Sequence, residues 1–273
     1  MTNPIHAQKI THSNRLEGSV VAITGAGSGN GKAAALRTGR EGASLYISDI
    51  NAELLEETIG DLKSEGINAQ GGIFDAANID DAPRFVAAVK EAHGRIDVLV
   101  NNAGAVKVEP FPNVSEENWD WTMNLNLKGA FFLMQEAAKP MIDQQSGNIV
   151  NIASIAGTFG GPTSSPSYAA AKAGLVNLTT VAAAVLAQYT IRVNAIAPGI
   201  INTPFHAPVD LAIGQEQLGL APGEHINTRV GLIPLGRLGE PEDVAATVAF
   251  LASEDAAHIS GETITVAGAM RSL

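Results

Sequence analysis

The residues best suited to chemistry are a tyrosine and a lysine four positions apart, Tyr168 and Lys172. Positions i and i+4 lie on one face of a helix, so the lysine ammonium can lie close to the tyrosine hydroxyl. A phenol has an ordinary pKa of about 10, and a cation at short range can lower that pKa to about 7. The pair therefore predicts a tyrosine that transfers protons near neutral pH. On its own, the same spacing also fits a half-buried tyrosine beside a solvated lysine.

A second candidate site is a glycine-rich turn, Gly25-Ala-Gly-Ser-Gly-Asn-Gly31, between a predicted strand at 20–24 and a helix that begins near Lys32. Glycines allow a tight turn and let a pyrophosphate approach the free N–H groups of a helix N-terminus. The spacing differs from G-x-G-x-x-G, and it is not a P-loop because Ala26 and Ala33 occupy two defining positions. A purely structural turn is therefore an alternative at this point.

Asp49 follows the second predicted strand, 18 positions after Gly31. A carboxylate at this place can accept both ribose hydroxyls of NAD and repel the 2′-phosphate of NADP. Ser28 and Ile50 put no cation beside that ribose. We therefore predict NAD as the cofactor. The alternative is that Asp49 is only a neighbour of a helix cap at Asn51.

The elements that position these residues alternate between strands and helices. Short β-branched runs predict strands at 20–24, 44–48, 98–101, 148–152 and 192–196. Three helices have recognisable ends: one from Asn51 to Gly66, one from Ser115 toward Met141, and one that Pro241 opens. This alternation predicts an α/β fold built from βαβ units around a parallel sheet.

One domain is predicted at 16–273, because no linker or repeat interrupts the alternation of elements. It follows a flexible N-terminal arm at 1–15, which is polar and lacks the apolar core of a secretory signal. The least regular stretch, 203–235, is rich in proline and glycine. It is predicted to form a lid or a surface excursion.

Composition excludes several classes of protein. The formal net charge is −11, so nucleic acid and an anionic membrane surface are not expected as partners. The absence of cysteine excludes disulfides and thiolate sites. No apolar stretch reaches the roughly 18 residues that a membrane span needs, the best candidate being Val181 to Ala187. We therefore expect a soluble, cytoplasmic protein.

No metal site is predicted, because the histidines are scattered and no pair has metal-binding spacing. They are His6, His12, His93, His206, His225 and His258. His206 and His225 flank the predicted lid, where a surface position is favoured over a substrate contact.

Five motifs then occur in a defined order. They are Thr24-Gly25-x-x-x-Gly29-x-Gly31, Asn101-Asn102-Ala103-Gly104, Ser154, Tyr168-x-x-x-Lys172 and Pro198-Gly199. In these motifs the chain resembles the short-chain dehydrogenase/reductase family, and within it NAD-preferring alcohol dehydrogenases similar to 3-oxoacyl reductases. The resemblance spans nearly the whole chain from Leu16. It implies a single-domain, Rossmann-type, doubly wound, mainly parallel sheet with helices on both faces.

The resemblance implies a catalytic tetrad of Asn126, Ser154, Tyr168 and Lys172. Tyr168 would exchange the hydroxyl proton while a hydride passes between the carbinol carbon and the nicotinamide. Ser154 would bind the substrate oxygen, Lys172 would hold the nicotinamide ribose and acidify the tyrosine, and Asn126 would position a relay water. The implied cofactor contacts are Gly25, Ser28, Gly29, Asn30, Gly31, Asp49, Ile50, Asp75, Ala76, Asn102, Ala103, Gly104, Tyr168, Lys172, Pro198, Gly199, Ile201 and Thr203.

The serine of this tetrad has competitors. Ser154 precedes Tyr168 by 14 positions, one more than the commonest family spacing, so Ser164, Ser165 and Ser167 are alternatives. Ser154 is preferred because it directly follows a predicted strand.

Three further assignments are also open. Asn124 competes with Asn126, which is preferred because Leu-Lys-Gly follows it as in the family. Asn30 stands where the family usually carries an apolar residue. Asp75 fits an ordinary loop residue nearly as well as an adenine contact.

The predicted substrate pocket is apolar. Its expected walls, 155–159 and 205–226, contain few cations and offer Phe159, Phe205, Leu211, Ile213, Leu218 and Leu220. This favours an apolar secondary alcohol or ketone over a sugar or an anionic acyl carrier.

Two other functions remain open. One is a 3-oxoacyl-(acyl carrier protein) reductase-like enzyme, which more often uses NADPH. The other is a non-catalytic dinucleotide-sensing protein, which typically lacks the tyrosine or the lysine. The resemblance also implies a homotetramer, with the helices around 115–141 and 166–187 at one interface.

Overall fold

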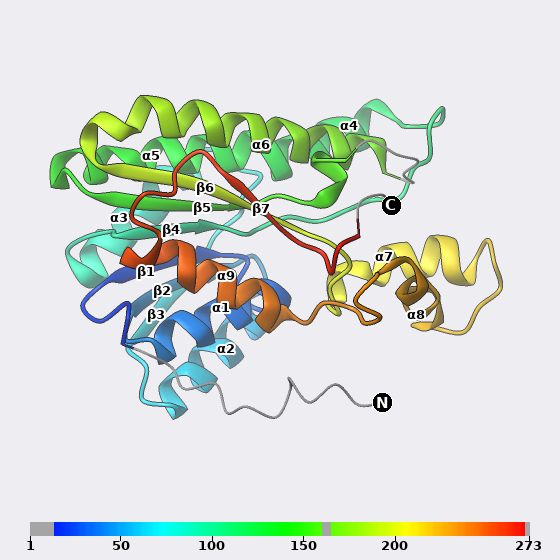
Figure 1. The fold of residues 1–273 in the computed structure, drawn as a ribbon, viewed down its shortest axis with the longest axis horizontal. Helices are drawn as coiled ribbons and strands as arrows, with labels where there is room; N and C mark the ends of the chain where they lie inside the picture. The colour runs from blue at the N-terminus through cyan, green and yellow to red at the C-terminus, as the bar shows by residue number, and fades with distance from the viewer. Residues whose placement is uncertain (1–13, 160–164, 271–273) are drawn as a thin grey trace.

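Seven parallel strands form one sheet in the residues that the computed structural model describes, 14–159 and 165–270. The strands are β1 (Val20–Thr24), β2 (Ser44–Asp49), β3 (Ala69–Ile73), β4 (Val98–Asn101), β5 (Gly147–Ile152), β6 (Ile191–Pro198) and β7 (Thr263–Val266). Their order across the sheet is β3-β2-β1-β4-β5-β6-β7 (Figure 1). The order reverses between β1 and β4, which is the place where doubly wound sheets bind their ligands.

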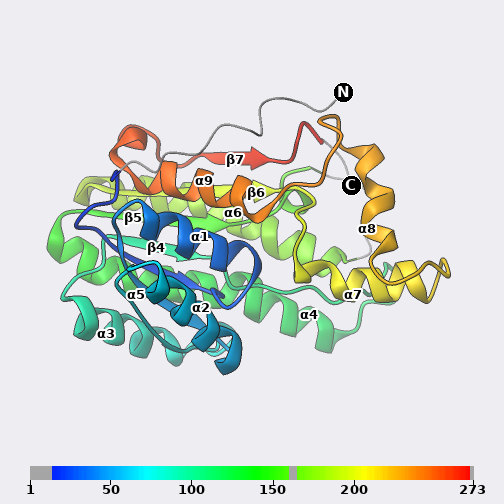
Figure 2. The ribbon, with the colours of Figure 1, turned by 90° about the horizontal axis from the view of Figure 1, so that it is seen from below.

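Helices cover both faces of this sheet (Figure 2). One layer contains α1 (Gly29–Arg40), α2 (Ala52–Ser64) and α9 (Pro241–Ala252). The other contains α3 (Asp81–His93), α5 (Gly129–Gln144) and α6 (Pro166–Leu186), and α4 (Glu116–Met123) continues it beside α6. This arrangement confirms the predicted doubly wound α/β fold with helices on both faces.

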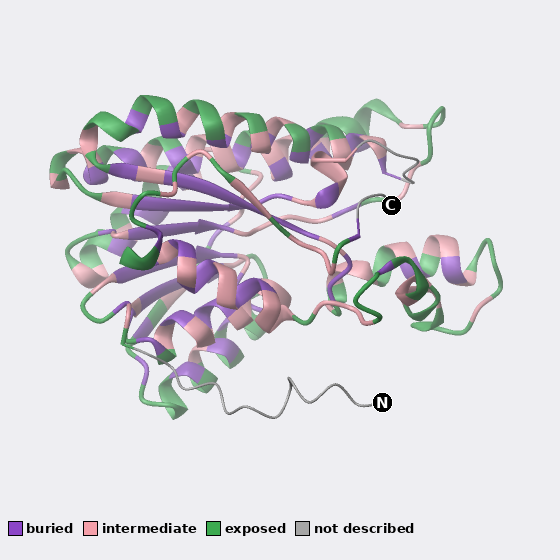
Figure 3. Ribbon diagram, in the orientation of Figure 1, coloured by how far each residue is buried: buried purple, intermediate pink, exposed green. Residues whose placement is uncertain are grey.

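Alternation of side chains along each strand creates two apolar cores, one under each helical layer. In β1, Val21 and Ile23 pack beneath α1, α2 and α9, while Val20 and Ala22 pack beneath α3, α5 and α6. Successive side chains of a strand point to opposite faces, so a central strand must be apolar at every position. Figure 3 shows these central strands buried along their length.

The five predicted strands are confirmed within one or two residues at each end, and two further strands were missed. β3 contains Gly71 and Gly72, and a Cβ on Gly71 would lie 2.3 Å from the carbonyl oxygen of Ile47. The adjacent strand β2 therefore leaves room only for glycine at position 71, where a typical strand would carry a β-branched residue. β7 is an edge strand of four residues, all of them β-branched, and this pattern could have identified it.

The predicted helix ends are confirmed in their caps. The side chain of Asn51 accepts a hydrogen bond from the backbone N–H of Leu54, and Ser115 accepts one from Asn118. The long helix after Ser115 is not one regular α-helix, however. A π-helical turn, η2 (Asn124–Lys128), joins α4 to α5, and α5 continues past the expected end to Gln144.

The segment predicted as a lid lies beyond the carboxyl ends of the strands, where Figure 1 shows it in yellow and orange. It consists of short helices: η5 (Pro204–His206), α7 (Ala207–Val209), η6 (Asp210–Gln215), α8 (Glu224–Thr228) and η7 (Arg229–Leu232). The carboxylate of Asp210 joins two of them, because it accepts hydrogen bonds from Gly223 N–H and Gln215 Nε2. The remaining short helices are η3 (Ile155–Gly157), η4 (Ala187–Tyr189) and η8 (Glu254–Ala256). Residues 1–13 of the predicted arm lie outside the described residues.

One helix, α6 with its extension to Tyr189, is long and apolar enough to cross a membrane by length and composition. This corrects the expectation that no stretch of the chain reaches that length. The same helix packs Ala183 and Leu186 on the sheet and buries the polar side chains of Lys172 and Thr179. Of its most apolar window, 33% is buried inside the protein, and length and composition alone do not show a membrane span.

A buried ion-pair network ties the start of the described chain to α1. Glu41 is fully buried and accepts hydrogen bonds from Arg15 at 2.8 and 2.9 Å and from Arg37 at 2.5 Å. Burial by itself would raise the pKa of Glu41, but the bonds from the two guanidinium groups outweigh burial and hold that pKa below its ordinary value.

Glu41→Gln is expected to lower the free energy of unfolding at neutral pH by about 3 kcal/mol, because two cations lose their buried partner. Since the folded-state pKa is depressed, this stabilisation is present above the unfolded-state pKa of about 4.3 and is lost as the pH falls through the folded-state value. Urea unfolding at neutral and acidic pH measures both effects. The two proteins should differ at neutral pH and converge in acid, whereas Lys139→Gln, in an exposed pair, should match the parent throughout. Equal urea midpoints for Glu41→Gln and the parent at neutral pH would contradict this account.

Candidate active site

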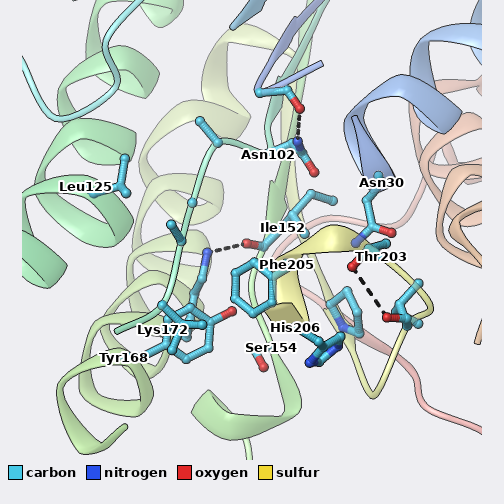
Figure 4. Close-up of a pocket in the computed structure, with 18 of the residues that line it drawn as sticks. Asn30, Asn102, Leu125, Ile152, Ser154, Tyr168, Lys172, Thr203, Phe205 and His206 are labelled. Carbon is cyan, nitrogen blue, oxygen red and sulfur yellow. Dashed lines mark hydrogen bonds between the residues drawn. The ribbon is translucent and has the colours of Figure 1, made fainter. Parts of the chain in front are cut away.

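A cavity of about 740 Å³ opens at the carboxyl edge of the sheet. Residues that follow β1, β2, β3, β4, β5 and β6 form its walls, and the first part of the lid closes its outer side. The volume lies within the range of sites that hold cofactors and small molecules. Figure 4 shows the side chains that converge on it.

The glycine-rich turn between β1 and α1 forms one end of the cavity. Gly25 and Gly29 have φ angles of 64° and 52°, a region that favours glycine. A Cβ on Gly31 would lie 2.1 Å from the carbonyl oxygen of Gly25, so the helix can approach the turn only without a side chain there. Asn102, after β4, holds the turn in place, since its Nδ2 donates to the carbonyls of Thr24 and Gly25 at 2.9 Å each.

The start of α1 at this turn is open to a ligand. Ser28 is the N-cap residue, yet its side chain makes no capping bond. The Oδ1 of Asn30, in the first turn, is buried and has no hydrogen-bond partner among the described residues. Uncapped N–H groups and the helix dipole attract an anion. The turn therefore fits the pyrophosphate of a dinucleotide. The Oδ1 of Asn30 remains available to accept a hydrogen bond from a donor group of the ligand or from water.

Asp49 lies against the same turn, at the end of β2. Its Oδ2 accepts the N–H of Gly27 and its Oδ1 accepts the N–H of Asn51, both at 2.9 Å. The cation nearest in sequence to the turn, Lys32, is bound by two carboxylates of α2 at 3.0 and 2.8 Å. Ile50 is exposed beside Asp49. The rim of the cavity at Asp49 thus carries a carboxylate that no cation of the turn neutralises.

The other predicted cofactor contacts also line the cavity. Asp75 and Ala76 follow β3, and the Oδ1 of Asp75 accepts the N–H of Ala77 at 2.9 Å. Thr203 begins the lid beside the glycine turn, where a Cβ on Gly29 would lie 3.3 Å from its Cγ2. The remaining predicted contacts that line the cavity are Asn102, Ala103, Gly104, Pro198, Gly199 and Ile201.

Three members of the predicted tetrad meet at the opposite end of the cavity. Tyr168 and Lys172 lie on successive turns of α6. The Nζ of Lys172 donates to the carbonyl of Ile152 at 2.8 Å and lies 5.6 Å from the centre of the Tyr168 ring. Ser154, just after β5, lies close enough to Tyr168 for its side chain to lower the pKa of the phenol. The structure therefore brings a hydroxyl, a phenol and an ammonium together inside one cavity (Figure 4).

Asn126 occupies the π-helical turn beside this group. Its Nδ2 donates to the carbonyls of Ala105 and Thr122 at 3.0 and 3.1 Å, while its buried Oδ1 has no partner among the described residues. A Cβ on Gly104 would lie 2.7 Å from that Oδ1 and 3.4 Å from the Nζ of Lys172. An unsatisfied acceptor and the ammonium thus border the same space, and a π-turn often marks a functional site.

The alternative residues lie elsewhere or have other partners. Ser167 is buried and donates to Thr122 at 3.5 Å, and Ser165 lines the cavity but donates to the carbonyl of Lys107 at 3.0 Å. Neither Asn124 nor Asn126 is among the cavity residues, but the Oδ1 of Asn126 lies beside Gly104, which lines the cavity. Ser164 lies outside the described residues. Among the serines that the structure describes, Ser154 is therefore the one whose side chain acts on the pKa of the phenol.

Burial dominates the electrostatics of the pair on α6. It raises the pKa of Tyr168 above its ordinary value, and the hydrogen bond with Ser154 offsets only part of that effect. Burial also lowers the pKa of Lys172 to about 8. The direction for Tyr168 is opposite to the one expected from the i, i+4 spacing, because removal from water disfavours the charged form of both groups. The phenol is thus protonated at neutral pH.

The substrate wall differs from the predicted one. Of the six apolar side chains proposed, only Phe205 lines the cavity, with its ring centre 5.6 Å from that of Tyr168. Leu211 and Leu218 are exposed, and Phe159 packs against a small core cluster. The lid folds on itself, so its leucines face outward. Other residues of the two predicted walls, Ile155, Pro208 and Val209, do line the cavity. The apolar wall also includes residues from the loop after β4 and from the helices that follow it: Val106, Trp121 and Leu125.

Two polar residues at the lid end of the cavity complete the site, His206 and Arg229. His206 was placed at the surface by sequence reasoning, and Arg229 was not singled out. Burial first, then the positive charge of Arg229, lowers the pKa of His206 to about 4, so the imidazole is neutral at pH 7. Neither residue belongs to a motif, and only the fold of the lid brings them to the cavity.

Comparison with known proteins gives consistent results. A family model described as short chain dehydrogenase matches residues 19–213. A 3-oxoacyl-(acyl-carrier-protein) reductase of Thermotoga maritima is 39% identical over 256 residues, 94% of this chain and 99% of that protein. A 7alpha-hydroxysteroid dehydrogenase of Bacteroides fragilis is 36% identical over 265 residues, 94% of this chain and 96% of that protein.

Two solved structures are similar over nearly their whole length. Levodione reductase superposes with a TM-score of 0.88 at 35% identity, covering 93% of this chain and 98% of that one. An actinorhodin polyketide ketoreductase variant, solved with NADPH, has a TM-score of 0.88 at 32% identity, covering 96% and 99%. These chains share both the fold and the family with the protein described here.

Proposed function

Because the chain belongs to the short-chain dehydrogenase family, we propose that it transfers a hydride between NAD(H) and a secondary alcohol or ketone with an apolar frame. The observation that supports this most directly is that Ser154, Tyr168 and Lys172 line one cavity, with the ammonium 5.6 Å from the centre of the phenol ring. The glycine turn at the other end of that cavity fits a pyrophosphate. A dinucleotide that binds there can extend toward the phenol.

The chain's own residues account for the proton transfer. A bound nicotinamide supplies the carbon that accepts or returns the hydride. In oxidation, Tyr168 as phenolate takes the alcohol proton, and Ser154 donates a hydrogen bond to the same oxygen. The O–H electron pair then forms the carbonyl double bond as the hydride leaves the carbinol carbon. In reduction, Tyr168 as phenol gives its proton to the carbonyl oxygen.

Lys172 and Asn126 support this transfer. The ammonium of Lys172 stabilises the phenolate, and it is also the donor that we assign to the nicotinamide ribose. We assign the relay water to Asn126, because its unsatisfied Oδ1 and the Nζ of Lys172 border the same space at Gly104. Protons taken up by Tyr168 would reach solvent along this route.

The choice of NAD over NADP rests on Asp49. Its carboxylate is held at the rim of the cavity by two backbone N–H groups. A 2′-phosphate at the same place would meet a negative charge, whereas a ribose would find two acceptor oxygens. The cations that line the cavity in the described residues, Lys172 and Arg229, lie at its catalytic and lid end.

A spectrophotometric panel tests the proposed function. Secondary alcohols and ketones, cyclic and linear, are assayed with NAD(H) and NADP(H) by the absorbance of the reduced cofactor. We expect turnover with NAD(H) and with apolar ketones. Turnover of no alcohol or ketone with either cofactor would contradict the proposal and favour a dinucleotide-sensing protein.

Asp49→Asn is expected to reduce the preference for NAD over NADP at least about tenfold, because it removes the charge and leaves the shape unchanged. The measurement is the ratio of kcat/KM for the two cofactors. Glu56→Gln, on the exposed face of α2, is the matched control and should leave the ratio unchanged. A parent enzyme that uses NADP(H) alone would refute the role given to Asp49.

A second candidate function is supported by the similarity to 3-oxoacyl-(acyl-carrier-protein) reductases. It predicts preference for NADPH and faster turnover of an acyl-carrier thioester than of any free ketone. The same cofactor panel separates the two functions. We also propose, from the family, a homotetramer and a cytoplasmic location. Analytical ultracentrifugation tests the first of these.

A further inference from the structure

Arg229 is an unusual cation in this acidic chain. Six other arginines of the described residues each bind a carboxylate: Arg15, Arg37, Arg40, Arg84, Arg95 and Arg237. Arg229 lines the cavity, yet its guanidinium makes no hydrogen bond or ion pair with any described residue. Burial alone lowers its pKa, with no opposing charge to raise it. A half-buried charge without a partner is costly unless a ligand supplies one.

The position of Arg229 is on the substrate side of the catalytic phenol. The ring of Phe205 lies 5.6 Å from that of Tyr168, and the ring of His206 lies 5.6 Å from that of Phe205. The charge of Arg229 acts on that same imidazole. Figure 4 shows His206 on the side of Ser154 and Tyr168, away from Asn30 at the glycine turn. The guanidinium therefore lies past the phenol rather than beside the expected pyrophosphate.

No carboxylate of the lid forms an ion pair with Arg229 among the described residues: Glu216 is exposed, and one oxygen of Asp210 is buried without a partner. Asp210 accepts bonds from Gly223 N–H and Gln215, and Glu224 accepts the N–H of Ala221. The carboxylates that line the cavity, Asp49 and Asp75, lie at the cofactor end. The cavity is thus negative where the adenosine is expected and positive where the substrate is expected.

We propose that the substrate carries a carboxylate, bound by Arg229, at the end opposite to the oxygen that faces Ser154 and Tyr168. A planar guanidinium can donate two parallel bonds to a carboxylate. The neutral imidazole of His206 has a single N–H, which is bonded to the backbone of Ile201, so the guanidinium is the donor at this end of the cavity. The substrate class is then an oxo acid or hydroxy acid whose apolar chain lies along Phe205 and Trp121. This inference rests on the proposed function, and it replaces a purely apolar substrate with one that is charged at one end.

Matched pairs of substrates test this directly. Straight-chain oxo acids, with the ketone at increasing distance from the carboxylate, are compared with their methyl esters at saturating NADH. For the best chain length, kcat/KM of the acid should exceed that of the ester at least about tenfold. In Arg229→Gln this ratio should fall at least about tenfold. Arg84→Gln, with an exposed arginine on α3, should keep the ratio of the parent.

A binding measurement separates failure of this inference from failure of the proposed function. Trp121 lines the cavity, so its fluorescence can report binding of saturated carboxylates and the matching alcohols to the NAD complex without turnover. If the parent binds the carboxylates more tightly than the alcohols, and Arg229→Gln loses this difference, the carboxylate site is supported even when no ketone is reduced.

Three results would overturn the inference. One is an equal acid-to-ester ratio in the parent and in Arg229→Gln, with equal binding of carboxylates and alcohols. Another is a rise in KM for NADH in Arg229→Gln without a change in that ratio, which would place the guanidinium on the cofactor. The last is a higher kcat/KM for a coenzyme A thioester than for every free acid, both in the parent and in Arg229→Gln.

Discussion

Tyr168→Phe is expected to lower kcat about 10³-fold in both directions, while the KM for NAD changes little. Phenylalanine keeps the ring that packs against Phe205 at 5.6 Å but has no proton to give or take. Stopped-flow or steady-state absorbance of NADH measures the loss. Tyr189→Phe, on η4 and outside the cavity, is the matched control and should retain the parent rate. A phenylalanine variant with full turnover would remove Tyr168 from the mechanism.

The same residue sets the direction of the pH dependence. Oxidation needs the phenolate, so kcat/KM for alcohols should rise with pH, because burial raises the pKa of Tyr168. Reduction needs the phenol, so kcat/KM for ketones should be flat near neutrality and fall only in alkali. The ammonium of Lys172 lies 5.6 Å from the centre of the Tyr168 ring, so the same profile is measured in Lys172→Met to separate the two groups.

Lys172→Met is expected to lower kcat about 10²-fold to 10³-fold and to raise the KM for NAD. The substitution removes the cation that stabilises the phenolate and the donor assigned to the nicotinamide ribose. It also leaves the carbonyl of Ile152 without the 2.8 Å bond that it accepts from the ammonium. Steady-state kinetics with varied NAD, together with circular dichroism to check folding, measures the effect.

The control for this variant is Lys139→Met, in an exposed pair on α5, which should behave as the parent. If Lys172 only positions the cofactor, Lys172→Met would raise the KM for NAD and leave kcat at saturating NAD unchanged. A catalytic role requires kcat to fall and its pH profile to shift to higher pH. Unchanged kcat with an unchanged profile would show that the phenol needs no neighbouring ammonium.

Local chemistry accounts for the part of this site that could be predicted before folding. The Tyr168–Lys172 spacing, the glycines before α1 and the carboxylate after β2 each act within a few residues, so their geometry follows from one helix, one turn or one strand end. The central strands were found for the same reason, because burial on both faces makes them continuously apolar. The edge strands were not found. In β3, Gly71 replaces an apolar residue because the carbonyl of Ile47 lies too close for a side chain.

The electrostatics could not be predicted from spacing, and the reason is burial. The i, i+4 rule places an ammonium near a phenol, but it does not say that both lie inside the protein. There, desolvation raises the pKa of Tyr168 and lowers that of Lys172 to about 8. The sign of the effect on Tyr168 therefore came from tertiary packing.

Only the tertiary structure shows which residues form the substrate end of the cavity. Leu211 and Leu218, chosen because they are apolar, turn outward, while Arg229 reaches the cavity 61 positions after Tyr168. Local sequence decides a turn or a helix face because the backbone links its atoms directly. Local sequence cannot decide which side of a lid packs against the sheet, because that side is set by close packing between segments that are far apart in the chain.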